Sequence, residues 1–210
     1  MDSALMGEEG GLSMYEYRKL TREQREELIR WRREKGFPLH APPHLEGFRG
    51  EYLITAACYE HRPIFEDPKM LTELTFSVLE ALKNSAFSCS AWVFLPNHYH
   101  LLITAHDLRE WSEFLRRLHS RIAAKVNREQ KQPGRRVWYR YSDRFIRGER
   151  HHWASVNYLH FNPVKHGYVD RIEDWPWSSW NAYEQMYGAE YMEEVFRSYP
   201  LNRYGDKWDP

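Results

Sequence analysis

The 210-residue chain lacks the marks of a secreted or membrane-bound protein. It has only two cysteines, Cys58 and Cys89, and no CxxC spacing, which argues against both a zinc ribbon and a disulfide framework. No basic start followed by an apolar run opens the chain, and no run of about eighteen consecutive apolar residues occurs. We therefore expect a cytoplasmic protein with no membrane partner and with both thiols buried and reduced.

The chain also has no net charge, because 30 Lys and Arg side chains balance 30 Asp and Glu. This balance hides a local excess: between Phe114 and Arg150, basic residues far outnumber the three acidic ones, Glu129, Asp143 and Glu149. A basic stripe on a neutral protein is typical of a groove that follows a nucleic-acid backbone, although a solvated helix face is the alternative. The candidate nucleic-acid-binding residues are Arg116, Arg117, Arg121, Lys125, Arg140, Arg144 and Arg147, with Lys165 further along.

The length suits one well-filled core with appendages. We predict that residues 1–49 form a polar tail, a basic helix and a linker. Thr21 and Gln24 have the spacing of a capping box at the start of that helix. Residues 50–187 are predicted to form the main domain, and residues 188–210 a C-terminal tail.

The main domain reads as strand, helix, hairpin, helix, strand, helix. This order predicts an α+β fold, a ferredoxin-like antiparallel sheet with helices packed on one face, plus N-terminal and C-terminal helical extensions. Asp67 opens the first helix, Pro96 and Asn97 form the hairpin turn, and Pro163 is expected to end the last helix. The expected elements are residues 51–60, 67–84, 88–95, 98–105, 108–128, a strand within 136–147, and 149–162.

Two pairs of side chains carry the chemistry. His98 and His100 alternate along a predicted strand, so both point to one face and can bind one metal ion. Tyr158 and Asn162 lie four residues apart on a predicted helix and also share a face. A tyrosine hydroxyl, with an ordinary pKa near ~10, needs a cation or a base to become a good nucleophile. The four residues together suggest metal-assisted attack of a tyrosine on a phosphodiester.

Each pair also has a purely structural interpretation. Two half-exposed histidines occur at this spacing by chance, Tyr158 and Phe161 suit a helix core, and Asn162 suits a helix cap before Pro163. The residue types alone leave both interpretations open.

Four segments, taken in order and spacing, resemble the single-tyrosine HUH transposases, and specifically their REP-associated tyrosine transposase branch. They are WVFLPNHYHLLI, WYRYSDRFIR, YLHFNPVKHGYV and DWPWSSW, and the similarity covers about residues 52–183. The resemblance implies that His98, His100 and Asn162 bind Mg²⁺ or Mn²⁺. It also implies that Tyr158 attacks single-stranded DNA, leaving a 5′-phosphotyrosyl link and a free 3′-hydroxyl.

The same resemblance implies that the protein is nucleoid-associated in the cytoplasm, that its partner is single-stranded or hairpin DNA, and that it is a monomer rather than a homodimer. Trp138, Tyr139 and Tyr141 are then available to stack on unpaired bases. Tyr139 and Tyr141 are rival nucleophiles, but neither has a helical partner four residues on. Two other functions stay open: a domesticated protein that binds structured DNA without cutting it, and a metal-dependent phosphodiesterase that uses water.

Overall fold

The computed structural model describes residues 50–202, 204 and 205, and residues 21, 23, 24, 27 and 30 nearer the N terminus. The chain divides into two compact units, residues 1–48 and 49–210. In the first unit the backbone N–H of Gln24 donates to Thr21 Oγ1 (3.2 Å), and that of Thr21 donates to Gln24 Oε1 (2.8 Å). The capping box is therefore confirmed, whereas the rest of the predicted basic helix and linker lies outside the described residues.

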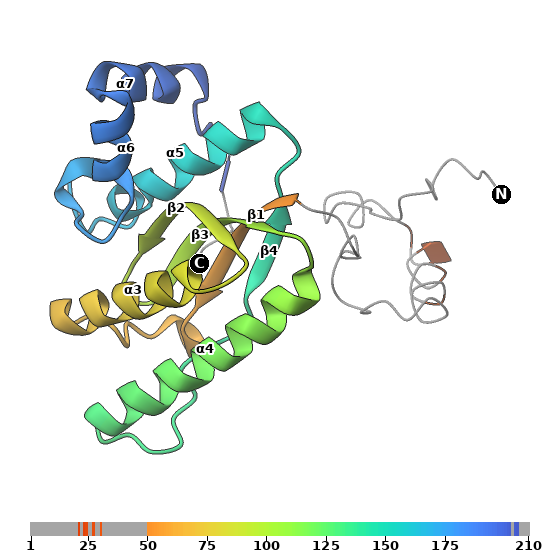
Figure 1. Cartoon of the computed structure of the whole chain (residues 1–210), viewed down its shortest axis with the longest axis vertical. Helices are drawn as coiled ribbons and strands as arrows, with labels where there is room; N and C mark the ends of the chain where they lie inside the picture. Colours follow the sequence, from red (N-terminus) through yellow and green to blue (C-terminus); the bar gives the residue numbers. More distant parts are fainter. Residues whose placement is uncertain are drawn as a thin grey trace. The chain divides into compact units, whose positions relative to one another are not determined.

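The second unit is built on a four-stranded antiparallel sheet (Figure 1). The strands lie in the order β2-β3-β1-β4, which is the order of a ferredoxin-like sheet. The α+β fold class is confirmed. The elements run β1 (Gly50–Ala57), η2 (Tyr59–His61), α3 (Pro68–Lys83), β2 (Ser88–Phe94), β3 (His98–Ala105), α4 (Leu108–Glu129) and β4 (Ser142–Phe145), followed by α5 (Glu149–Lys165), η3 (Ile172–Asp174), α6 (Trp180–Tyr187) and α7 (Ala189–Ser198).

Short polar side chains set the starts of the long helices. Asp67 accepts a hydrogen bond from the Met70 backbone N–H at 3.0 Å, and Asp107 caps α4 in the same way through Arg109. Pro68 occupies the first turn of α3, where its missing N–H costs nothing. These caps begin the helices at the positions that the sequence predicts.

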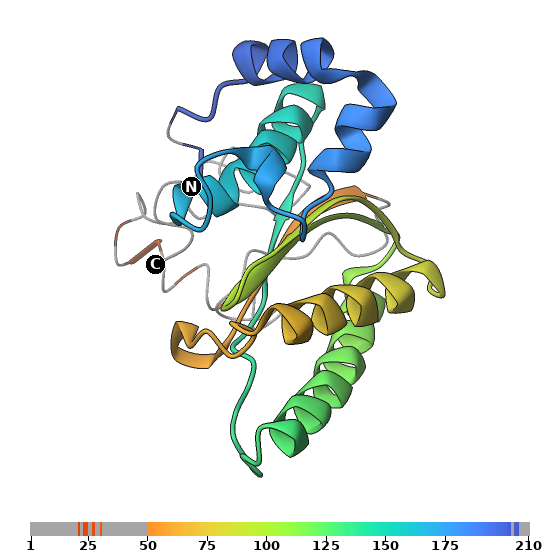
Figure 2. The same ribbon diagram turned by 90° about the vertical axis from the view of Figure 1, so that its left-hand side faces the viewer.

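Helices cover both faces of the sheet (Figure 2). On one face, the Tyr99 hydroxyl lies 2.6 Å from His119 Nε2 of α4. On the other, the ring of His100 packs against Tyr158 of α5, with centroids 5.2 Å apart. The expectation that helices lie on one face therefore holds for α3 and α4 and is wrong for α5, because the alternating residues of β3 offer each face its own contacts.

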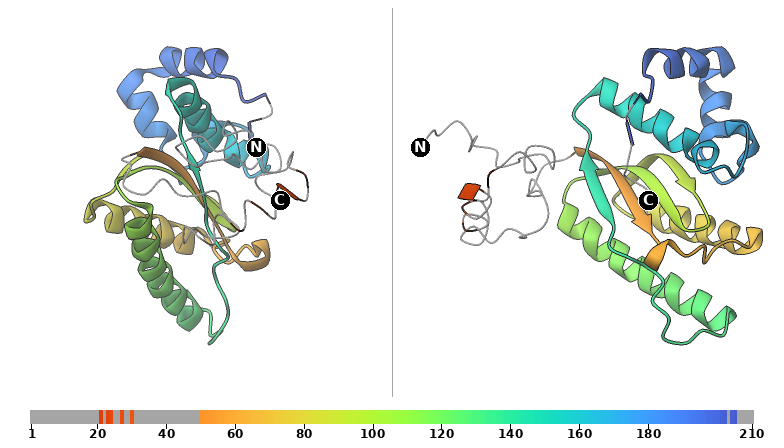
Figure 3. Two further views of the ribbon diagram at one scale, coloured as in Figure 1. Left: turned by 90° about the vertical axis from the view of Figure 1, so that its right-hand side faces the viewer. Right: turned by 180° about the vertical axis from the view of Figure 1, so that it is seen from behind.

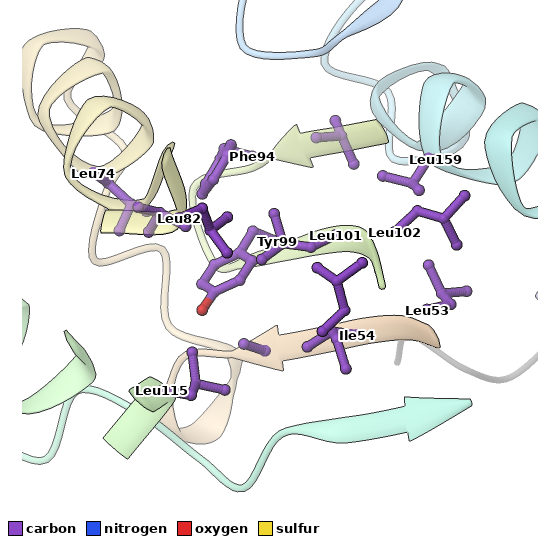
Figure 4. Close-up of a cluster of buried hydrophobic side chains, with 14 of the residues drawn as sticks. Leu53, Ile54, Leu74, Leu82, Phe94, Tyr99, Leu101, Leu102, Leu115 and Leu159 are labelled. Atoms are coloured by element: carbon purple, nitrogen blue, oxygen red, sulfur yellow. The ribbon is translucent and has the colours of Figure 1, made fainter. Parts of the chain in front are cut away.

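The core fills the space on both sides of the sheet (Figure 4). Leu159 of α5 lies beside Leu53 and Leu102, while Leu74 of α3 and Leu115 of α4 lie on the opposite side. In the described part of the chain, no helix is both long and apolar enough to cross a bilayer.

Helix α5 extends past the point where the sequence predicted its end. Pro163 lies inside the helix, and the last turn closes through hydrogen bonds from the His166 N–H to Asn162 O (3.0 Å) and from the Tyr168 N–H to Pro163 O (2.9 Å). Proline removes one backbone donor, but burial of Pro163 and its neighbours outweighs that loss. Asn162 consequently keeps helical geometry one turn beyond Tyr158.

Candidate active site

Strand β3 and helix α5 bring together the four residues singled out from the sequence. The rings of His98 and His100 lie 5.0 Å apart, and His100 lies 5.2 Å from the ring of Tyr158. Asn162 Oδ1 lies 3.1 Å from His98 Nε2. All four side chains are buried, so two segments some sixty residues apart form one polar cluster beneath the surface.

Neighbouring residues orient both imidazoles. His98 Nδ1 lies 2.7 Å from Asn97 Oδ1, and His100 Nδ1 lies 2.8 Å from Thr55 Oγ1. Because an amide oxygen only accepts, His98 Nδ1 must donate, and the neutral ring then keeps its lone pair on Nε2. Contacts of this kind on the outer nitrogen are usual for histidines that bind metal.

The contact between His98 and Asn162 tests whether a cation fits. In neutral His98 the lone pair of Nε2 points toward Asn162 Oδ1, which is also a hydrogen-bond acceptor. Two acceptor atoms 3.1 Å apart repel each other unless a cation or a proton binds both of them. Without a cation, a half-turn of the amide would let Nδ2, which has no hydrogen-bond partner among the described residues, donate to His98. The donor set therefore fits a divalent ion.

Asn162 Oδ1 would have to be the third protein ligand of this ion, after the two histidines. Among the residues that the structure describes, no three His, Cys, Asp or Glu side chains gather as a metal cluster. Few protein ligands suit Mg²⁺, which usually keeps several waters or phosphate oxygens.

Two basic side chains flank the tyrosine. Lys165 Nζ lies 5.2 Å from the centroid of the Tyr158 ring. Burial lowers the pKa of the Arg144 guanidinium, while the nearby hydroxyls of Tyr204 and Tyr158 work in the opposite direction. Positive charge placed here stabilises the negative charge of a phenolate or of a phosphate under attack.

Tyr204 and Gly205 form a covering segment over Tyr158, which is only 2% exposed. Tyr204 packs edge-on against its ring at 5.9 Å, and the Tyr204 hydroxyl lies 2.5 Å from Ser155 Oγ. Gly205 lies so close that a Cβ atom there would stand 2.1 Å from Tyr158 Cε2. Tyr204 and Gly205 therefore lie directly against the Tyr158 ring.

Comparison with known proteins finds similar sequences and a similar fold. No family model matches the chain. A REP-associated tyrosine transposase of Escherichia coli is 26% identical over 143 residues, which are 65% of this chain and 74% of the relative. A REP-associated relative from Haemophilus influenzae is 26% identical over 121 residues, 53% of this chain and 69% of its own length.

One solved structure has the same fold. It is a REP-associated tyrosine transposase bound to a REP hairpin, with a TM-score of 0.55, 23% identity, and coverage of 71% of this chain and 86% of that one. By sequence, this chain is similar to the REP-associated tyrosine transposases. The matched lengths leave part of this chain outside the similarity.

The sequence analysis did not single out His166. Its ring lies 5.1 Å from that of His98, and it stands four residues after Asn162 and eight after Tyr158. The helical spacing was visible in the sequence, but Pro163 was expected to end the helix before it. His166, directly after α5, is therefore a third polar side chain on this face, beside Tyr158 and Asn162.

The predicted DNA-binding residues divide between α4 and the neighbourhood of Tyr158 on α5, two helices that lie on opposite faces of the sheet (Figure 3). Arg144 and Lys165 lie beside Tyr158, and Arg147 adjoins them through its N–H contact to His151 Nδ1. Arg140 is exposed in the segment before β4. The other four, Arg116, Arg117, Arg121 and Lys125, belong to α4, across the sheet from α5.

Three of the α4 residues are held by acidic neighbours. Arg116 and Arg117 both pair with Glu113 at 2.8 Å, and Lys125 pairs with Glu73 at 2.8 Å. This part of the basic stripe thus has the features of a solvated helix face, the alternative that the sequence left open.

Proposed function

We propose that this chain nicks and rejoins single-stranded DNA beside a hairpin, with Tyr158 as the nucleophile. The main observation that supports this proposal is that His98 and His100 contact Tyr158 and Asn162 in one buried cluster. Its further support is homology to REP-associated tyrosine transposases, one of which is solved with a REP hairpin.

The reaction exchanges one phosphodiester for another. The Tyr158 oxygen forms a bond to phosphorus and releases its proton, while the bond from phosphorus to the 3′-oxygen breaks and that oxygen takes up a proton. The products are a 5′-phosphotyrosyl link and a free 3′-hydroxyl. Because the phosphotyrosyl bond retains the energy of the broken bond, another 3′-hydroxyl can reverse the reaction without a nucleotide cofactor.

The protein side chains divide the work. Arg144 and Lys165 would neutralise charge on the phosphate, and helix α5 would hold the hydroxyl at a fixed distance from the histidines. His98, His100 and Asn162 would hold Mg²⁺ or Mn²⁺, which supplies a Lewis acid for the phosphate oxygens.

The test is covalent capture. The protein is incubated with Mg²⁺ or Mn²⁺ and end-labelled single-stranded hairpins from DNA flanking its own gene, and the products are separated on a denaturing gel. We expect a slow, protease-sensitive adduct that Tyr158→Phe abolishes. Tyr141→Phe serves as the matched control, because it removes a half-buried hydroxyl from another part of the domain and should leave the adduct in place.

The other outcomes identify the alternatives. Cleavage by both the native protein and Tyr158→Phe, with no adduct, would establish a phosphodiesterase that uses water. Hairpin binding without cleavage by any variant would establish a domesticated DNA-binding protein.

A further inference from the structure

Only one of the three aromatic side chains between residues 138 and 141 is free to contact a base. Trp138 is stacked between His119, with ring centroids 4.2 Å apart, and Phe65, at 5.4 Å. Tyr141 is half-buried and hydrogen-bonded to Ser112. Tyr139, in contrast, is 55% exposed.

Tyr139 belongs to a cluster of two tyrosines and one arginine. The Arg136 guanidinium carbon lies 4.4 Å from the ring centroid of Tyr59 and 5.6 Å from that of Tyr139, and the two rings are 6.3 Å apart. Arg136 Nε also donates to Trp138 O at 3.2 Å. A planar guanidinium stacked in this way keeps donors at its edge that suit a phosphate.

The charge of the surrounding segment suits a nucleic-acid strand. Residues 130–142 contain no Asp or Glu, and they include Lys131, Arg135 and Arg140 besides Arg136. An exposed aromatic ring in a basic segment is the usual arrangement for binding unpaired nucleotides, because every base has a face that can stack.

The cluster has a fixed place beside the candidate active site. The N–H of Tyr139 donates to Ala57 O (2.9 Å), the N–H of Tyr59 donates to Val137 O (2.7 Å), and Ala57 pairs with His98 across β1 and β3. Two strand spacings, about 10 Å, therefore separate the backbones of Tyr139 and His98.

The side chain of Tyr139 points to the same face of the sheet as the candidate active site. Cys58 and Trp138 form an antiparallel bridge, and Trp138 points to the face covered by α4. Because successive extended residues alternate, Tyr139 points to the face that carries His98 and His100.

We infer that Tyr59, Arg136 and Tyr139 form a base clamp, in which Tyr139 stacks on one unpaired nucleobase and Arg136 binds an adjoining phosphate. The inference rests on the proposed function in one respect, namely that single-stranded DNA is the substrate. It adds a contact that fixes the register of the unpaired strand a short distance from the phosphate beside Tyr158.

Binding of defined DNA probes tests the clamp. The probes are a blunt DNA hairpin and the same hairpin with a flank of about ten thymidines on its 5′ or its 3′ side. All proteins carry Tyr158→Phe and are measured without metal, so that cleavage does not enter the result. We expect Tyr139→Ala and Arg136→Ala to raise the Kd for one flanked probe roughly tenfold, about 1.4 kcal/mol, without changing the Kd for the blunt hairpin.

Two controls separate stacking from general damage. Tyr139→Phe keeps the ring and should bind within about twofold of the parent, a difference well below the tenfold step of 1.4 kcal/mol. Tyr191→Ala removes a tyrosine that is 45% exposed on α7, and it should have no effect. In addition, 5-iodouracil in the flank should photocrosslink to Tyr139, as mass spectrometry of the peptides would show.

Either of two results would overturn the clamp. One is equal binding of flanked and blunt probes by the parent protein, and the other is an identical Kd for Tyr139→Ala and Tyr191→Ala. The covalent-capture assay decides the proposed nicking reaction separately. If the adduct forms but Tyr139→Ala does not change the Kd for either probe, only the clamp is refuted. If binding depends on the flank but no adduct forms, only the nicking reaction is refuted.

Discussion

Gly205→Ala should accelerate formation of the DNA adduct. The residue has φ +84°, and a Cβ atom there would lie 2.1 Å from Tyr158 Cε2, closer than real side chains approach. The left-handed backbone alone costs alanine about 1–2 kcal/mol. The clash arises only while Gly205 lies against Tyr158. The substitution therefore destabilises this covered state relative to a state in which Gly205 has moved away from the ring.

The size of the effect follows from the strain. A destabilisation of about 1–2 kcal/mol shifts a two-state equilibrium by a factor of roughly 5–30. If the covered state predominates, the initial rate of adduct formation should rise by that factor. The assay is the denaturing gel with Mn²⁺ and the flanking hairpins, read at early times.

A second glycine provides the matched control. Gly188 has φ +87°, but a Cβ atom at that position would meet nothing within 4 Å. Gly188→Ala therefore has comparable backbone strain without the collision and should leave the rate unchanged. Equal rates for the native protein and Gly205→Ala, or a slower rate for Gly205→Ala, would refute the idea that this segment limits access to Tyr158.

Three other predictions follow from charge and burial. Burial raises the pKa of both Cys58 and Cys89 to about 12, so iodoacetamide at pH 8 should label neither thiol in the folded protein and both in denaturant, as mass spectrometry would show. Burial lowers the pKa of His119 to about 3, so between pH 7 and pH 5 this residue takes up a proton in the unfolded chain but not in the folded one. This residue alone should lower the free energy of unfolding by roughly 2 kcal/mol from pH 7 to pH 5, and in His119→Gln the pH dependence should be smaller by that amount, as measured by urea unfolding. Arg144→Ala should weaken binding of single-stranded DNA more than Arg117→Ala, because Arg117 is paired with Glu113 across the sheet from Tyr158; equal losses by fluorescence anisotropy would contradict this division.

The sequence predicted the fold well wherever local chemistry decides it. Strand β3 spans His98–Ala105 as the pattern indicated, and Asp67 and the Thr21 capping box begin their helices as expected. Alternation along a strand and four-residue spacing on a helix placed both pairs of candidate site residues on the correct faces. These features depend on neighbours within about one turn, and such neighbours are visible in the sequence.

Features set by tertiary contacts were not predictable in the same way. A linear basic stripe does not show which face of the sheet each helix covers, so residues of α4 were grouped with Arg144, which lies near Tyr158 of α5, although the sheet lies between α4 and α5. The contact of Gly205 with Tyr158 joins positions far apart in the chain and has no local signal. The exposure of Tyr139, beside a fully stacked Trp138, depends likewise on the packing of α4.

Pro163 shows how a local rule yields to packing at the candidate site. A proline inside a helix costs a hydrogen bond and ordinarily bends or ends the helix. Here the following turn remains hydrogen-bonded, and both Asn162 and Pro163 are buried against the core. Ending the helix at Asn162 would release the backbone of the side chain whose oxygen lies 3.1 Å from His98, and would move His166 away from the same imidazole. The continued helix keeps Tyr158, Asn162 and His166 in one row, so the candidate nucleophile and the candidate metal ligands are held in a fixed register by α5 itself.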